Sequence, residues 1–248
     1  MDLTARLRAA GCVFAEDEAL LLHDAPEDLV RRRIAGEPLE HLLGRVEFAD
    51  LLVHLDPGVF IPRRRTELLA REAVALLAGQ PWRPLVVDLC CGSGAVGAVL
   101  ERAGARVHAS DLDPVAVACA RRNLVRVHRG DLFSGLPSRL RGRVDVVVAN
   151  APYVPTGDLD LLPHEARVHE PRLALDGGPD GLAVQRRVAA GARRWLRPVG
   201  HLLVETSRWQ APLTADVLSD AGFGARVVTC DDLEATVVVG RQPCRRAA

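Results

Sequence analysis

The stretch Leu85-Val86-Val87-Asp88-Leu89-Cys90-Cys91-Gly92-Ser93-Gly94 decides the fold. It begins with an apolar run typical of a buried strand and leads directly into a turn with two glycines. Glycines at such a place let the backbone turn tightly against a ligand. After this stretch, further apolar runs alternate with helix-length segments. The pattern predicts a doubly wound α/β sheet that is mostly parallel.

The expected sheet has seven strands. We place them near residues 85–89, 106–110, 124–128, 144–149, 200–205, 225–229 and 235–240. Helices are expected near residues 66–78, 95–103, 114–122, 181–196 and 210–221. Only residues 230–234 separate the last two strands, which is too short for a crossover helix, so this pair should be antiparallel.

Two other strand ends carry polar residues that indicate a ligand site. The strand at 106–110 ends in Asp111, whose carboxylate can accept hydrogen bonds from ribose hydroxyls. The strand at 144–149 ends in Asn150-Ala151-Pro152-Tyr153. In an open α/β sheet the ligand lies outside the carboxyl ends of the strands, so Asn150 should project over it.

The order of glycine turn, acidic strand end and Asn-x-Pro-Tyr indicates a methyltransferase that uses S-adenosylmethionine. Asp88 favours this cofactor, because a carboxylate just before the turn binds an ammonium group but disfavours a pyrophosphate. Gly97 has the spacing of the third glycine of the dinucleotide fingerprint, so a dinucleotide site is the alternative interpretation. That alternative leaves residues 150–153 unexplained.

Several segments occur in the order seen in one known family. They are Gly36-Glu37-Pro38-Leu39, Phe60-Ile61-Pro62-Arg63 with Thr66-Glu67, residues 88–94, Gly130-Asp131-Leu132-Phe133, residues 150–153 and residues 174–182. Over about residues 36–240 the chain therefore resembles the HemK/PrmC family of protein-(glutamine-N5) methyltransferases. The resemblance implies a class I, Rossmann-like enzyme that methylates the side-chain amide of a protein glutamine, such as one in a peptide-chain release factor.

The resemblance also implies which residues form the site. The catalytic residues would be Asn150, Ala151, Pro152 and Tyr153. The cofactor-binding residues would be Asp88, Cys90, Cys91, Gly92, Ser93, Gly94, Asp111, Asp131, Leu132 and Asn150. Asp131 would contact adenine while Leu132 packs on the ring, although capping a helix is the alternative role for this aspartate.

A carboxamide acceptor explains the chemistry of the Asn-x-Pro-Tyr loop. An amide nitrogen is a poor nucleophile, because its lone pair is delocalised into the carbonyl. If the Asn150 side-chain oxygen and the Ala151 carbonyl each accept one N–H, they orient that nitrogen for attack. Pro152 keeps Ala151 extended, and Tyr153 would form an apolar wall.

The chain also departs from the family pattern. Ala151 and Arg64 stand where the family has proline, and the N-terminal helical domain is expected to be short. We expect residues 1–45 to be helices that cap the sheet or dock a substrate, residues 46–65 a hairpin and linker, and residues 66–248 the catalytic domain. The short docking region predicts a paralogue whose glutamine-containing substrate differs from a release factor. Arg63, Arg64 and Arg65 would contact acidic or phosphate groups of this substrate.

Composition restricts the partners. The chain has 32 basic and 32 acidic residues, so its net charge is zero and does not attract the protein to nucleic acid. Six cysteines without paired spacing predict reduced thiols, no metal site and a cytoplasmic location, and no apolar run predicts a membrane segment or signal peptide. His164, Glu165, His169 and Glu170 lie in one loop, and we expect their side chains to hold this loop over the substrate rather than bind a metal ion.

Two alternative functions stay open at this stage. An RNA or DNA amino-group methyltransferase would present adenine's planar NH₂ to the same loop. A non-catalytic protein that only binds S-adenosylmethionine is the other alternative, and Ala151 is its sole indication.

Overall fold

The computed structural model describes residues 2–79 and 82–244. Its central element is a seven-stranded sheet with the order β5-β4-β3-β6-β7-β9-β8. The strands are β3 (Leu85–Leu89), β4 (Arg106–Asp111), β5 (Val127–Arg129), β6 (Val144–Ala149), β7 (Leu196–Thr206), β8 (Gly224–Cys230) and β9 (Ala235–Arg241). Strand β9 runs antiparallel to both its neighbours, and the other pairings are parallel. The predicted sheet and its antiparallel last pair are confirmed.

Three predicted elements had wrong boundaries. Strand β5 begins at Val127, not near 124, because residues 121–124 complete the turn after helix α7 (Pro114–Ala120) and the Leu124 N–H still donates to Ala120. Helix α10 (Ala183–Ala192) is shorter than predicted at both ends, and strand β7 begins four residues early, at Leu196. The strand starts there because Val144 at the beginning of β6 pairs with Leu196 across a register shift.

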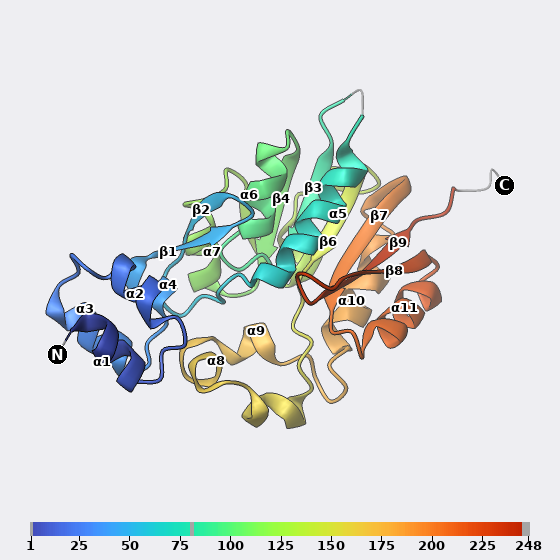
Figure 1. The fold of residues 1–248 in the computed structure, drawn as a ribbon. Coiled ribbons are helices and arrows are strands. Elements are labelled where there is room, and N and C mark those ends of the chain that lie inside the picture. The colour runs from blue at the N-terminus through green and yellow to red at the C-terminus, as the bar shows by residue number, and fades with distance from the viewer. Residues whose placement is uncertain (1, 80–81, 245–248) are drawn as a thin grey trace.

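Helices cover both faces of the sheet (Figure 1). Helices α5 (Glu67–Leu77), α6 (Ala95–Arg102) and α7 pack on one face, and α10 and α11 (Ala211–Asp220) pack on the other. Alternate residues of each strand point to opposite faces, so Val86 contributes to the first cluster and Val87 to the second. All residues of the central strands β3 and β6 are buried, as expected for a sheet covered on both sides.

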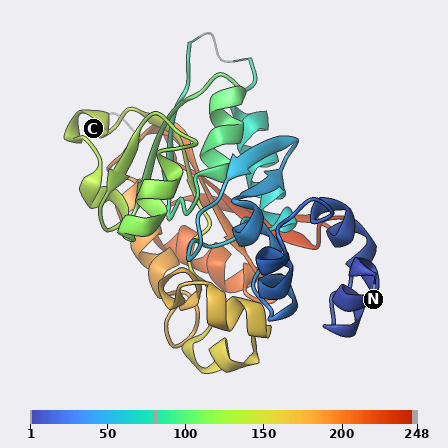
Figure 2. The same ribbon diagram turned by 90° about the vertical axis from the view of Figure 1, so that its left-hand side faces the viewer.

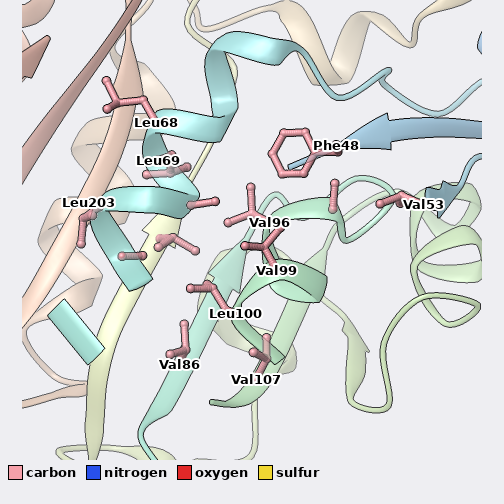
Figure 3. Packing of buried hydrophobic residues seen from close by; sticks show 14 of the residues in the cluster. Phe48, Val53, Leu68, Leu69, Val86, Val96, Val99, Leu100, Val107 and Leu203 are labelled. Carbon is pink, nitrogen blue, oxygen red and sulfur yellow. The ribbon is translucent and has the colours of Figure 1, made fainter. Parts of the chain in front are cut away.

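A hairpin extends the first cluster. Strands β1 (Arg45–Phe48) and β2 (Leu51–His54) pair antiparallel, and Phe48 and Val53 are buried. Figure 3 shows Phe48 beside Val96 and Val99 of α6. The hairpin is therefore part of the core that supports the glycine turn at the start of α6.

The N-terminal residues form the expected small helices, α1 (Leu3–Ala9), α2 (Ala15–Leu21), α3 (Glu27–Ile34) and α4 (Leu39–Leu43). They have their own small core around Leu7, Ala15 and Leu22. Between β6 and α10 the chain forms η4 (Thr156–Leu161), α8 (His164–His169) and α9 (Arg172–Leu175), which lie apart from the layers of the sheet domain (Figures 1 and 2). Within residues 2–79 and 82–244, no helix has the length and apolar character needed to span a membrane.

Candidate functional site

A cavity of about 440 Å³ lies at the carboxyl ends of β3, β4 and β6. Its size is within the range of small-molecule sites. Every predicted site residue except Gly94 borders it. These residues are Asp88, Cys90, Cys91, Gly92, Ser93, Asp111, Asp131, Leu132, Asn150, Ala151, Pro152 and Tyr153. The topology thus brings four separate sequence segments to one cavity.

Gly94 has a structural position instead. It precedes α6 with φ +82°, in the left-handed region that favours glycine. A Cβ there would lie 2.7 Å from Cδ1 of Leu124. Gly94 thus turns the chain while α6 packs against Leu124, and its assignment to the cofactor site stays a prediction.

The glycine turn is tied to the end of the neighbouring strand. The Gly92 N–H donates to Asp111 Oδ2 at 2.9 Å, and the Cys91 N–H donates to the Ser110 carbonyl at 3.2 Å. Cys90 has φ +53°, a conformation that is costly for a residue with a side chain. The hydrogen bonds to β4 hold this strained turn against the cavity.

Two buried carboxyl groups flank the turn. Burial raises the pKa of Asp88 to about 7, although the Gly97 N–H, 3.0 Å from Oδ2, opposes the rise. A Cβ on Gly97 would lie 2.8 Å from Cδ1 of Leu124 and 3.0 Å from the same oxygen, so a larger residue would crowd Asp88. Burial also raises the pKa of Asp111, against the N–H groups of Gly92 and Asp113. A cationic ligand group would stabilise the ionised form of either carboxyl.

The loop after β5 forms another wall of the cavity. Leu132 has φ +51°, and its carbonyl accepts a hydrogen bond from Ser110 Oγ at 2.8 Å. Asp131 precedes η2 (Leu132–Gly135) but makes no capping hydrogen bond. Its carboxylate instead pairs with Arg187 of α10 at 2.5 Å. The helix-capping alternative for Asp131 was therefore wrong, whereas Asp113 does cap α7 through the Val115 N–H.

Asn150 is held from a distant segment. Its Nδ2 donates to Thr66 Oγ1 at 3.3 Å, and Thr66 is buried at the end of η1 (Arg64–Thr66). Within the described part of the chain, no group donates to Asn150 Oδ1, and the residue borders the cavity. The amide oxygen is thus available to accept an N–H of a ligand.

A glycine-rich segment supports the rest of this loop. The Gly177 N–H donates to the Val154 carbonyl at 2.8 Å, and a Cβ on Gly177 would lie 2.8 Å from the Pro152 carbonyl oxygen. A Cβ on Gly181 would overlap the Tyr153 carbonyl oxygen, which accepts a hydrogen bond from Gln210 Nε2 at 2.9 Å. The close approach of these backbones requires glycine at both positions.

The segment of η4, α8 and α9 is attached by ion pairs. Glu165 pairs with Arg33 at 2.6 Å, and buried Glu170 pairs with Arg63, whose guanidinium also lies 5.2 Å from the Phe60 ring centroid. These contacts agree with the expected loop-holding role of the two glutamates. Among the described residues, no group of three or more His, Cys, Asp or Glu is placed to hold a metal ion.

The three arginines proposed as substrate contacts differ in availability. Arg63 is engaged by Glu170, and Nε of Arg65 lies 3.6 Å from Oε1 of Glu205. Only exposed Arg64 has no ion pair within residues 2–79 and 82–244. The fold directs two of them to buried glutamates, so their role as substrate contacts stays a prediction in which Arg64 is the most available of the three.

Sequence reasoning assigned no role at the site to Thr66 and Gln210, which hold the Asn150 loop, or to the buried carboxyl group of Glu205. Glu205 lies at the carboxyl end of β7, beside β6, and is 2 % exposed. A usable signal existed, because Glu205 is a polar residue at the end of an apolar strand, as Asn150 is. Thr66 lies in a segment that resembles the family, but nothing in the sequence connected Thr66 or Gln210 with the Asn150 loop, because both are far away in the chain.

The cavity fits S-adenosylmethionine. Ser93 Oγ is buried, borders the cavity and has no hydrogen-bond partner among the described residues, so it is available to a polar ligand group. Asp111 uses one lone pair of each oxygen for a backbone N–H, which leaves further lone pairs for hydroxyl groups. Parallel-sheet topology and this constellation define a class I S-adenosylmethionine-dependent methyltransferase.

Comparisons with known proteins agree with this class. A family described as a methyltransferase domain matches residues 86–172. The release factor glutamine methyltransferase of Streptomyces coelicolor is 41 % identical over 199 residues, which cover 74 % of this chain and 70 % of that protein. A 4-amino-L-phenylalanine/4-methylamino-L-phenylalanine methyltransferase of Streptomyces pristinaespiralis is 40 % identical over 191 residues. These residues cover 73 % of this chain and 65 % of that protein.

A solved structure shows the same fold. The Thermus thermophilus 16S rRNA N2 G1207 methyltransferase, in complex with AdoMet and guanosine, matches 80 % of this chain and 49 % of that chain, with a TM-score of 0.57 and 21 % identity. The chain belongs to the release factor glutamine methyltransferase family. It is an S-adenosylmethionine-dependent enzyme, and the dinucleotide alternative for the glycine turn is overturned.

Proposed function

We propose that this enzyme transfers a methyl group to the side-chain amide nitrogen of a glutamine in a peptide-chain release factor. The observation that carries the proposal is the Asn150 amide, which is held through Nδ2 by Thr66 and presents its free oxygen at the cavity. Relatives named for this activity support the substrate. The nucleic-acid and non-catalytic alternatives have no comparable support.

The residues of the loop would act by orientation. Bound S-adenosylmethionine supplies an electrophilic methyl group. Asn150 Oδ1 and the Ala151 carbonyl would each accept one N–H of the substrate amide, which directs its nitrogen toward the cofactor and favours the positive charge that develops. No general base has to act first, because the methylated amide loses its extra proton readily to water.

The neighbouring residues would complete the acceptor site. Ala151 is 1 % exposed, and its backbone carbonyl needs no proline to act as an acceptor. Pro152 restricts Ala151 to extended conformations, so the carbonyl direction is retained. Tyr153 would pack against the planar substrate amide, and Gln210 fixes its backbone.

The cofactor residues would act on opposite ends of S-adenosylmethionine. Asp88 and the glycine turn would hold the amino-acid end, and Asp111 would accept hydrogen bonds from the ribose hydroxyls. Asp131 and Leu132 would hold the adenine. Cys90 and Cys91 would only fill space, because burial raises the pKa of both thiols and keeps them protonated.

The protein substrate would dock outside the cavity. We propose the helices of residues 1–45 and exposed Arg64 as parts of the docking surface. A shifted glutamine-containing substrate, with Arg64 as its main contact, stays an alternative prediction, which methylation of the release factor independent of Arg64 would contradict. A cytoplasmic location is part of this proposal, since all six cysteines lie among the described residues and none is disulfide-bonded.

A small aromatic amine is the second candidate substrate. The relative from Streptomyces pristinaespiralis favours it, because that protein is named for methylation of an aminophenylalanine. An aryl amine also presents a planar NH₂ to Asn150. The apolar residues Phe60, Ile61, Leu162 and Leu173 border the same cavity and could contact its ring.

The test offers both substrates to the purified enzyme with S-adenosylmethionine. We expect mass spectrometry to locate one added methyl group on the glutamine of the Gly-Gly-Gln loop of the release factor. Methylation of 4-amino-L-phenylalanine with no methylation of the release factor would assign the small-molecule function instead. Slower release-factor methylation by Arg64→Ala would support the proposed docking contact.

A further inference from the structure

The segment of η4, α8 and α9 (residues 156–175), called the lid from here on, forms one wall of the cavity. Its side chains at the cavity include those of Leu162 and Glu165. The end of the lid returns to the acceptor loop, since the Val154 N–H donates to the Leu175 carbonyl at 3.1 Å. The position of the lid therefore sets the shape of the acceptor side of the cavity.

The lid has few contacts that could hold it in this position. Among the described residues, no backbone-to-backbone hydrogen bond joins it to any residue outside 150–183. Ala166 is the only buried residue of α8, and Leu161 at the end of η4 is exposed. A segment that buries so little apolar surface opens easily unless polar contacts close it. The ion pairs with Arg33 and Arg63 are therefore the contacts that decide its position.

Arg33 is fixed in place by the N-terminal helices. It lies on α3, is 9 % exposed, and donates from Nε and Nη2 to the two carboxylate oxygens of Glu18 on α2, at 2.7 and 2.9 Å. This two-point contact orients the planar guanidinium and leaves Nη1 for other acceptors. Nη1 donates to the Glu37 carbonyl at 3.0 Å and to Oε1 of Glu165 at 2.6 Å. One buried guanidinium thus joins two N-terminal helices to the lid.

We infer that Arg33 is a positioning residue through which the N-terminal helices hold the lid over the acceptor side of the cavity. This inference rests on the proposed transfer to an amide held by Asn150. Arg33 does not border the cavity, so it acts on the reaction only through Glu165 and the lid. A closed lid keeps water out and confines the acceptor amide. The N-terminal helices then shape the site of transfer, a role that is separate from docking the substrate.

Kinetics provide the first test. Glu165→Gln is the milder variant, because this side chain is 48 % exposed and the Arg33–Glu18 pair stays intact. We expect Glu165→Gln and Arg33→Met each to lower kcat for the release factor about tenfold, with no further loss in the double variant. A residue that only docks the partner would raise KM and leave kcat unchanged.

A carboxylate elsewhere on the lid provides the control for the kinetics. Asp160 is exposed and does not border the cavity, so Asp160→Asn should have the kcat and KM of the wild type. Wild-type kcat in Glu165→Gln would overturn the inference. Losses that add in the double variant would also overturn it, because Arg33 and Glu165 would then act independently.

Amide hydrogen exchange provides a second test that needs no substrate. With S-adenosylhomocysteine bound, we expect the amides of residues 162–170 to exchange about tenfold faster in Glu165→Gln than in the wild type. Arg32→Met is the matched control, because Arg32 lies on the same helix but pairs with Glu37 instead of the lid. It should leave the exchange of the lid unchanged. Equal exchange in Glu165→Gln and the wild type would contradict the positioning role.

The two tests separate the possible failures. A wild-type enzyme that does not methylate the release factor contradicts the proposed function, whereas hydrogen exchange still reports whether Arg33 holds the lid. A lid that is unaffected by Glu165→Gln and Arg33→Met contradicts the positioning inference, even if the enzyme methylates glutamine.

Discussion

The two halves of the cavity are held together in different ways. On the β3–β4 side, the contacts join residues that are close in sequence, such as Asp88 with Gly97 and Gly92 with Asp111. On the β6 side, Asn150 is held by Thr66, which is 84 residues away, and Tyr153 by Gln210, which is 57 residues away. The cofactor half is thus encoded by a compact motif, whereas the acceptor half is assembled by the tertiary fold.

This difference has a consequence for evolution of function in such a fold. A compact motif can bind one invariant ligand without help from distant segments. A loop supported by several segments can change its acceptor when any of those segments changes. The similar identities of a release factor enzyme and an aminophenylalanine enzyme to this chain are consistent with that view.

The largest expected effect comes from breaking the acceptor half alone. Asn150→Ala should lower kcat by about 10²–10³, because it removes a preorganised acceptor of the transferring amide. Calorimetry should find that the affinity for S-adenosylmethionine falls much less than kcat does. Wild-type activity in this variant, with an established substrate, would show that Asn150 does not orient the amide.

A substitution in the cofactor half should change mainly the affinity for S-adenosylmethionine. Asp111→Ala should weaken S-adenosylmethionine binding by about 1.5–3 kcal/mol, the scale of charge-assisted hydrogen bonds. Isothermal titration calorimetry measures the change directly. Asp111→Asn is the matched control, because it keeps an acceptor for the Gly92 N–H but lacks the charge, and it should weaken binding less. Unchanged affinity in the alanine variant would remove Asp111 from the ribose site.

A smaller effect is expected from the support of the acceptor loop. Gly181→Ala should lower the free energy of unfolding by about 1–3 kcal/mol more than Gly104→Ala, since a Cβ at 181 would overlap the Tyr153 carbonyl. Gly104 also has a positive φ, but a Cβ there meets no atom within 4 Å. Urea denaturation of both variants separates packing from backbone strain. Equal stability of the two variants would mean that the backbone near Tyr153 moves away from the added Cβ without a cost in free energy.

The smallest effect concerns the pH dependence of the cofactor half. His108 of β4 and His128 of β5 stack, with Nδ1 of the first 2.9 Å from Nε2 of the second. Burial lowers the pKa of both, to about 4 for His108, and their mutual repulsion when charged adds to the shift at His108. The folded state therefore favours the neutral imidazoles.

The sign of the stability change follows from these pKa values. An unfolded histidine has a pKa of about 6.5, so the unfolded chain binds these protons first. The stabilising effect is complete above that pH and is lost as the pH falls toward about 4. Calorimetry from pH 7.5 to 4.5 should find a steeper loss of Tm in the wild type than in His128→Gln. Parallel curves for the two proteins would contradict the role of the histidine pair.

Much of the fold could be predicted from the sequence. Buried strands such as β3 and β6 are apolar runs interrupted by a single aspartate, so their limits were predicted within one residue. The limits of β5 and β7 were not, because a turn after α7 and a register shift beside Val144 depend on neighbouring elements. Gly94 shows the same limitation, because its packing against Leu124 is a contact between separate segments.

The sequence by itself determined the strand positions, the mostly parallel sheet with its antiparallel last pair, the cofactor class and several residues that border the cavity. These features depend on hydrophobic periodicity and on polar residues at strand ends, which are local properties of the chain. The tertiary structure alone decided that Thr66 holds Asn150, that Gln210 holds the Tyr153 carbonyl, and that Arg63 and Arg65 turn to buried glutamates. Hydrogen bonds and ion pairs of this kind depend on distances between segments far apart in sequence, and only packing sets those distances.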